Sequence, residues 1–349
     1  ATLLSLTLLI RVNRSWKIPY EAAKVSGKSF ALGWLSLLVA VILLYVATGN
    51  WHINVTLAND DVITSGMRFI IDMLIVLAVV VPAAQFPFQS WLIESVAAPT
   101  PVSAIMHAGI VNAGGIILTR FSPVFNDPLA ITILLIIASI SVLLGSGISL
   151  VHVDYKRQLV GSTMSQMGFM LVQCALGVYS AAIIHLILHG VFKATLFLQS
   201  GSVVKRFNIP TPPSAKRSYS WVVLGRCLAI IIAILFWLGS DRSAYEILSA
   251  LILAWSLMVS WNQMVAFSRG LIGRVIGIIM IVIVALVYIV THHYFYNTLS
   301  HVYMNVAHPP LMSVIIGILI LVFGSVLSIW VARQRDSKAF AVLYLWLVK

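Results

Sequence analysis

The sequence predicts an all-α polytopic membrane protein with about ten transmembrane helices, and three observations support this fold class. Hydrophobic residues make up 60% of the chain and charged residues only 9%, against about 25% charged residues in a soluble domain. Apolar runs recur at lengths near the roughly 20 residues that cross a bilayer. Basic residues collect on alternate connections between these runs. The three observations together argue against a soluble domain.

The predicted spans follow from the apolar runs in order. They lie near residues 30–49, 67–88, 102–120, 129–151, 159–178, 180–203, 221–239, 246–267, 273–291 and 310–331. Residues 1–10 are apolar but too short to span, so we expect either a longer protein or neighbouring helices that support this segment. The final stretch, 339–349, is also too short, and we expect it to lie along the membrane surface or against a partner.

The positive charge of +12 predicts topology rather than nucleic-acid binding. With loop 11–28 in the cytoplasm and the spans alternating, only Arg68, Arg120 and Arg242 fall outside. The basic residues that fall inside are Arg11, Arg14, Lys17, Lys24, Lys28, Lys156, Arg157, Lys205, Arg206, Lys216, Arg217, Arg269, Arg274, Arg333, Arg335 and Lys338. This positive-inside asymmetry predicts a multi-pass protein of the cell membrane with its basic loops in the cytoplasm.

Polar residues enter the spans mainly between residues 67 and 206, so we expect the functional site there. Pro82, Pro87, Pro99 and Pro101 interrupt one apolar region, and a broken helix is tolerated in a membrane only where protein or a water-filled cavity supports it. The alternative is a re-entry loop at the cytoplasmic surface in which Glu94 is simply solvated.

His107 lies about a turn and a half into the following span, with Asn112 five residues later. A histidine inside a membrane segment is by default a candidate functional residue, because it titrates near neutral pH and needs a partner. A packing role is the alternative.

The strongest pattern is the series His185, His189 and Lys193, at i, i+4 and i+8. These positions line one face of a helix over about 12 Å. Three ionisable groups on one stripe inside lipid are hard to explain by packing, so the pattern predicts a proton relay. Lys193 alone could instead pair with a carboxylate and fix the helix register.

The helix before this stripe contributes hydroxyl and amide groups, of which Thr163, Gln166 and Gln173 are expected to line a water-filled path. Small hydroxyl residues also simply let helices approach each other closely. Asp72 is either a surface ion pair with Arg68 or a carboxylate at the external end of the path. The external-loop residues His292, His293, His301 and His308 could bind a metal, but their irregular spacing favours solvated side chains, and no metal or other cofactor is expected in this chain.

Three long motifs carry a family resemblance, and they occur in order over residues 83–125, 154–170 and 185–203. They read "AAQFPFQSWLIESVAAPTPVSAIMHAGIVNAGGIILTRFSPVF", "DYKRQLVGSTMSQMGFM" and "HLILHGVFKATLFLQSGSV". The stretch from about 22 to 206 resembles the proton-translocating module shared by the antiporter-like subunits of respiratory complex I and the large subunits of Mrp-type sodium/proton antiporters. The resemblance implies a half-channel with a broken helix and a hydrated row of charged groups at mid-membrane.

The resemblance carries proton-path roles to His107, Lys156, His185, His189 and Lys193. Glu94 matches the family's acidic residue before "APTPVSA", and Lys156 is expected to bias the path by its charge. In two respects the chain departs from the family. The position of the family's central lysine is occupied by Pro82, and the family glutamate of the preceding helix would fall just before Ala1.

Beyond residue 206 the resemblance fades, so we expect two domains. Residues 1–206 form the antiporter-like module, with its N-terminal part truncated, and residues 207–349 form a divergent helical bundle with a short amphipathic end. This outline is similar to the membrane subunits of two-component inorganic carbon pumps, the DabB or MpsA family. That similarity implies a large soluble zinc-containing partner, DabA or MpsB, at the cytoplasmic face.

The sequence therefore predicts a transporter subunit, not an enzyme, that moves H⁺ or Na⁺ to drive CO₂ or bicarbonate uptake by this partner. The only other partner expected is membrane lipid, and no nucleic acid. The alternatives are an antiporter-like subunit of a complex I-type NADH-quinone oxidoreductase, a subunit of an Mrp Na⁺/H⁺ antiporter, and a membrane anchor that only recruits a cytosolic enzyme.

Overall fold

The computed structural model describes residues 2–12, 16–52, 62–152, 154–200 and 219–238, with isolated positions between 254 and 345. All regular elements in these residues are helices. The chain divides into two compact units, residues 1–205 together with 301–349, and residues 206–300. Each unit is described by itself, and the functional division at residue 206 stays a prediction.

Several predicted features lie wholly or partly outside the described residues. They are the spans at 246–267, 273–291 and 310–331, the loop at 205–219, the final stretch 339–349, and the histidines His292, His293, His301 and His308. Among the described residues, four helical segments are long and apolar enough to cross a membrane: Lys17–Thr48, Thr100–Phe121, Pro128–Ser149 and Tyr179–Gln199. The protein is therefore polytopic, and the count of about ten spans stays a prediction.

Helix α2 (Lys17–Thr48) follows the short α1 (Thr2–Ile10) and has 32 residues. The predicted loop over 11–28 is therefore wrong from residue 17 onward. A helix of this length is about 48 Å long, whereas the hydrocarbon core is about 30 Å thick. The apolar run marks only the part inside the membrane, and the basic first turns extend the same helix beyond it.

The predicted interruption is present after α4 (Ser65–Val80). Helix α4 ends before Pro82, which has no backbone N–H to continue the helix, and Ala84 has a positive φ of 53°. The chain resumes a helix in α5 (Ser90–Glu94) and η2 (Ser95–Ala97). The indole of Trp91 donates to the Val81 carbonyl oxygen at 2.8 Å, so protein groups satisfy the opened backbone, as a membrane interior requires.

A second interruption was not predicted. The span expected over 102–120 consists of α6 (Thr100–Ala108), η3 (Ile110–Asn112) and α7 (Ala113–Phe121). The break lies at Gly109, where an added Cβ would be 2.8 Å from the Ile105 carbonyl oxygen. His107 and Asn112 therefore flank an irregular turn.

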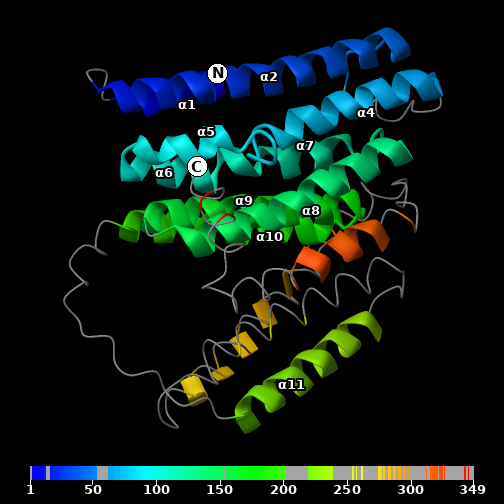
Figure 1. Cartoon of the computed structure of the whole chain (residues 1–349). Helices are drawn as coiled ribbons and strands as arrows, with labels where there is room; N and C mark the ends of the chain where they lie inside the picture. The colour runs from blue at the N-terminus through cyan, green and yellow to red at the C-terminus, as the bar shows by residue number, and fades with distance from the viewer. Residues whose placement is uncertain are drawn as a thin grey trace. The chain divides into compact units, whose positions relative to one another are not determined.

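Helices α8 (Pro128–Val151), α9 (Tyr155–Ala175) and α10 (Tyr179–Gln199) follow the predicted spans closely. Asp127 caps the start of α8 and Asp154 the start of α9, because each side chain accepts two backbone N–H groups. In the first unit, Figure 1 shows α1 and α2 in one layer, α4 to α7 in the next, and α8 to α10 beyond them.

The second unit contains α11 (Tyr219–Leu238). The Trp261 indole donates to the Trp221 carbonyl oxygen at 2.8 Å, and the Arg274 guanidinium lies 4.9 Å from the centre of the Trp221 ring. These contacts form a small aromatic core, and the predicted site residues all lie in the first unit.

Candidate functional site

Side chains of three helices of the first unit meet around the Thr163 hydroxyl and the Leu159 carbonyl oxygen on α9. The Thr163 hydroxyl donates to this oxygen at 2.9 Å, and the Lys193 ammonium on α10 donates to it at 3.1 Å. His107 on α6 places Nδ1 3.0 Å from the Thr163 hydroxyl oxygen. We call these four residues the Thr163 cluster. The structure thus links three residues that the sequence predicted as separate members of one path.

The hydrogen bonds of the Thr163 cluster define a tautomer of His107. A threonine hydroxyl has one proton and two acceptor lone pairs. When that proton is directed at the Leu159 carbonyl oxygen, the contact with His107 requires an N–H on Nδ1. If Nδ1 loses its proton, the Thr163 hydroxyl can turn and donate to the ring instead, which leaves the Leu159 carbonyl oxygen to Lys193 alone.

His107 is 1% exposed and stacks on Phe197, with ring centres 4.1 Å apart and planes 17° apart. Phe197 was not identified from the sequence. Its spacing of four residues from Lys193 on α10 was the available signal, because residues at i and i+4 share a helix face. Helix α10 therefore contacts the Thr163 cluster at two successive turns.

Lys193 is 0% exposed, and its recorded hydrogen bond is to a carbonyl oxygen. The alternative in which Lys193 pairs with a carboxylate finds no support among the described residues. A buried ammonium held by a carbonyl rather than by a counter-ion is costly. Stability alone therefore gives little reason for a lysine at this position.

The two histidines of the stripe differ in their surroundings. His189 is 4% exposed, and neither of its ring nitrogens has a hydrogen-bond partner among the described residues. The centre of the His185 ring lies 6.2 Å from the centre of the His189 ring. His185 is half-buried and contacts two glutamine side chains of α9, with Nε2 2.9 Å from Gln166 Oε1 and Nδ1 3.1 Å from Gln173 Oε1.

Asn112 is bound within its own segment. Its Nδ2 donates to the Ala108 carbonyl oxygen at 2.7 Å, while its buried Oδ1 has no partner. Gly190 lets α10 come close at this point, because an added Cβ would lie 3.0 Å from the Ala108 carbonyl oxygen and 3.7 Å from Asn112 Nδ2. Asn112 therefore lies beside the stripe, next to Gly190, which is between the buried His189 and Lys193 in sequence.

Lys156 and Glu94 lie near the turn between η2 and α6. The half-buried Lys156 donates from Nζ to the Ala98 carbonyl oxygen at 3.3 Å. Glu94 is exposed, as in the alternative with a solvated carboxylate. Partial burial and the neighbouring Glu21 carboxylate both raise the pKa of Glu94 above its ordinary value. Glu94 makes no hydrogen bond to the Thr163 cluster in the described part of the chain.

Asp72 lies apart from the other predicted residues. It is 0% exposed, so the surface position expected in one alternative is wrong, while Arg68 still acts on its charge. Its Oδ2 accepts the backbone N–H groups of Asn126 and Asp127 at 3.1 and 2.8 Å. The carboxylate therefore anchors the connection between α7 and α8 to α4. Its predicted role at the outer end of a path stays a prediction.

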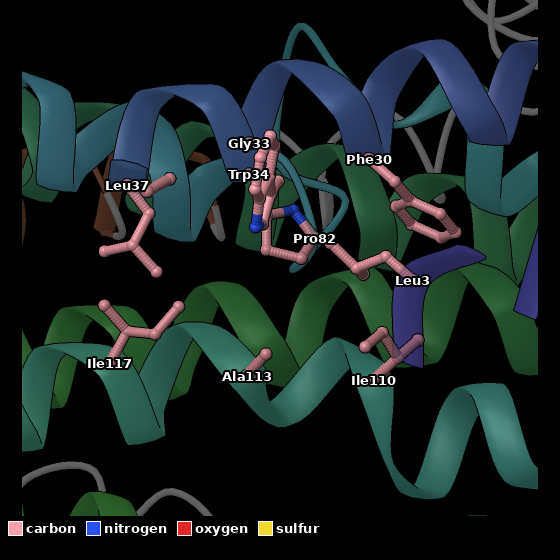
Figure 2. Close-up of a pocket in the computed structure, with 10 residues that line it drawn as sticks. Leu3, Phe30, Gly33, Trp34, Leu37, Pro82, Ile110, Ala113 and Ile117 are labelled. Atoms are coloured by element: carbon pink, nitrogen blue, oxygen red, sulfur yellow. The ribbon is translucent and has the colours of Figure 1, made fainter. Parts of the chain in front are cut away.

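Pro82, at the position of the family lysine, lines a cavity of about 110 Å³ whose lining is apolar (Figure 2). The other lining residues are Leu3, Phe30, Gly33, Trp34, Leu37, Ala78, Ile110, Ala113 and Ile117. No side chain in this lining can hold the proton that a lysine would hold. No side chain that lines this cavity therefore replaces the family's lysine, whose position Pro82 occupies.

Gln85, which was not singled out in the sequence, lies in the break between α4 and α5. It is fully buried, and its Nε2 donates to the carbonyl oxygens of Ala83 and Met164 at 2.6 and 3.3 Å. The available signal was a polar residue inside the proline-interrupted run. Its contacts show that the break packs against α9, the helix that carries Thr163.

Known protein families and a solved structure resemble this chain. The profile of the NADH:quinone oxidoreductase/Mrp antiporter transmembrane family matches residues 1–277. Two relatives are named probable inorganic carbon transporter subunit DabB. The protein from Bacillus subtilis is 58% identical over all of this chain and 70% of the relative, and that from Bacillus anthracis is 53% identical over all of this chain and 69% of the relative.

The solved structure of the Mrp complex from Dietzia has the same fold, with a TM-score of 0.63 at 23% identity over 96% of this chain and 42% of its own chain. The family profile covers more than half of the chain, and the two relatives are aligned along its whole length. The chain therefore belongs to the NADH:quinone oxidoreductase/Mrp antiporter membrane family and, within it, to the group of the DabB subunits.

Proposed function

We propose that this chain is the cation-translocating membrane subunit of an energy-coupled inorganic carbon uptake system, and that its cation is the proton. The names of the two most fully aligned relatives support inorganic carbon as the transported substrate. The observation that carries the cation role is the stripe on α10, where Lys193 and His189 are buried inside a predicted span. Stability alone gives little reason to bury such groups there.

The chemistry of the buried groups favours H⁺ over Na⁺. Hard cations are bound by several oxygen ligands, including carboxylates and carbonyls. The described stripe offers imidazole nitrogens and an ammonium instead, and these groups exchange protons. The proposed path runs from Lys156 and Glu94 to His107, through Thr163 to Lys193, and along α10 to His189 and His185.

His189 is the proposed link between Lys193 and His185. Buried polar atoms without protein partners are usually hydrated, and both ring nitrogens of His189 are in this situation. Water at this point would join the Thr163 cluster to the outer histidine. Asn112, with its unpartnered Oδ1, is proposed to line the same part of the path with Gln166 and Gln173.

Carbon chemistry is proposed to lie in a partner. The family resemblance implies a large soluble DabA/MpsB-like zinc protein, and we propose that it docks at the cytoplasmic face, where the basic first turns of α2 would lie. This chain would then supply energy from the ion gradient without catalysing a covalent reaction. The zinc would belong to the partner.

The test is uptake of labelled inorganic carbon by carbonic-anhydrase-deficient cells that express the complete protein with its soluble partner. Uptake is measured with and without a protonophore and with Lys193→Ala. Val191→Ala is the matched control, because Val191 lies on the same helix as Lys193 but is 67% exposed and outside the path. We expect uptake to require both proteins, to be lost with protonophore or Lys193→Ala, and to survive Val191→Ala.

Uptake that persists with Lys193→Ala would contradict the proposed path and favour the membrane-anchor alternative. Absence of uptake, with co-purification of redox or antiporter subunits, would contradict the carbon role. The second candidate function, an antiporter-like subunit of a complex I-type or Mrp assembly, is favoured by the family profile and the Mrp fold. In both functions the stripe on α10 would conduct the cation.

A further inference from the structure

We propose that Gln166 and Gln173 are positioning residues that form an amide clamp on His185 and satisfy its ring in both protonation states. The proposal rests on the proposed function, in which His185 belongs to the proton path. It goes beyond a general polar lining, because it assigns each glutamine to one ring nitrogen.

The geometry of the clamp comes from one helix face. Gln166 and Gln173 are seven residues apart on α9, or about two turns, so their side chains project on the same side. The His185 ring of α10 lies between them, with Nε2 against Gln166 Oε1 at 2.9 Å and Nδ1 against Gln173 Oε1 at 3.1 Å. Phe169, between the two glutamines in sequence, has its ring centre 5.8 Å from that of His185. Both ring nitrogens are therefore held by the same element.

The chemistry of the clamp follows from the two ends of an amide. A side-chain amide presents an oxygen that accepts and an NH₂ group that donates. With both oxygens toward the ring, the clamp matches an imidazolium, in which both nitrogens carry protons, and such hydrogen bonds to a charged group are the strong ones. When one nitrogen gives up its proton, that proton passes through water to the neighbouring His189. The facing amide then turns, and its N–H donates to the free lone pair.

The surroundings of His185 make the glutamines its main polar contacts. On α10 the ionisable groups of the stripe are His189 and Lys193, and α6 contributes His107. From α9, the groups near the ring are the two amides and Phe169. The Cys174 thiol follows Gln173 by one residue. Lys156 and Arg157 lie at the other end of α9. Arg120 lies in the last turn of α7. No carboxylate among the described residues contacts the ring through a hydrogen bond, so amide orientation is the local means of balancing its charge.

The test is nitrogen-15 NMR of the complete protein in lipid nanodiscs, with labelled histidine and the His185 signals assigned by His185→Asn. The measured quantity is the ratio of doubly to singly protonated His185 rings, at the pH where the wild-type ratio is one. We expect Gln166→Leu and Gln173→Leu each to lower this ratio about tenfold, which is the effect of losing one hydrogen bond to a charged group. Gln173→Glu is nearly isosteric and should raise the ratio.

Gln158→Leu is the matched control, because Gln158 lies on the same helix and its Nε2 donates to the His152 carbonyl oxygen at 2.7 Å. It should leave the ratio unchanged. An unchanged ratio in Gln166→Leu and Gln173→Leu, or a lowered ratio in Gln173→Glu, overturns the clamp. Proton flux in proteoliposomes separates the two proposals: normal flux in His185→Asn would refute the role of His185 in the path, while the NMR ratios still decide the clamp.

Discussion

Thr163 connects two ionisable residues that lie on different helices. Its hydroxyl shares the Leu159 carbonyl oxygen with Lys193 and contacts Nδ1 of His107. Because the hydroxyl has a single proton, a change of protonation at His107 changes the number of donors that compete for the carbonyl. The protonation of His107 and the hydrogen bonding of Lys193 are therefore coupled through one side chain.

Replacing Thr163 by valine removes the hydroxyl and keeps the shape of the side chain. We expect Thr163→Val to reduce proton flux in proteoliposomes about tenfold, because His107 loses its hydrogen-bond partner and the coupling to Lys193 is lost. Thr163→Ser retains the hydroxyl and should restore most of the flux. Equal proton flux in Thr163→Val and Thr163→Ser would show that the hydroxyl has no role in proton transfer and that Thr163 only packs.

At this scale the sequence predicted the charged residues but not their partners. The i, i+4, i+8 spacing identified the stripe on α10, because that pattern is local to one helix. The Leu159 carbonyl, the stacking of Phe197 on His107 and the burial of Asp72 depend on contacts between helices. Asp72, for example, accepts N–H groups from residues more than 50 positions away, and no local pattern reports such a contact.

Among the elements, the connection between α7 and α8 depends on one carboxylate. Asp72→Ala would remove the oxygen that accepts two backbone N–H groups of this partly buried connection, and we expect it to lower the free energy of unfolding by about 2 kcal/mol. Asp72→Asn keeps an oxygen acceptor and should melt close to the wild type in thermal unfolding of the purified protein. If Asp72 carries protons, Asp72→Asn should melt normally yet lose proton flux.

The α8–α9 pair depends on glycines at its closest approach. A Cβ added at Gly161 would lie 2.6 Å from the Ser149 nitrogen and 2.8 Å from the Gly145 carbonyl oxygen. Gly161→Ala should therefore force the helices apart and cost about 1–3 kcal/mol, measured as a lower Tm. Gly66→Ala is the matched control, since no atom lies within 4 Å of its added Cβ, and it should not lower the Tm. Equal Tm values for the two variants would contradict the close packing.

The sequence located the described helices well and their irregularities only in part. Apolar runs predicted the cores of α8, α9 and α10, because a membrane segment must be apolar along most of its length. The prolines predicted the break after α4. The break at η3 has no proline and depends on a single glycine, and the basic start of α2 lies outside any apolar run. A hydropathy profile therefore predicts neither the break at η3 nor the helical start of α2.

At the scale of the whole first unit, polar and apolar features lie on different sides of the layer formed by α4 to α7. The hydrogen-bonded groups lie between α6, α9 and α10, whereas the cavity at Pro82 lies among α1, α2, α4, η3 and α7. A lysine at position 82 would lie against this cavity, and the proline there instead adds to its apolar lining. The path that we propose therefore passes along α9 and α10 without using the α2 side.

Filling the cavity tests this separation. Ala113 lines the cavity, and Ala113→Leu places additional apolar atoms in it, so we expect a gain of about 1 kcal/mol in the free energy of unfolding and unchanged proton flux. Ala138→Leu is the control for size, because Ala138 is fully buried on α8 in close contact with Gly168, and it should destabilise the protein by about 1–3 kcal/mol. Loss of proton flux in a well-folded Ala113→Leu variant would mean that protons, or the water that carries them, pass on the Pro82 side. Water in the cavity would then take the functional place of the family's lysine.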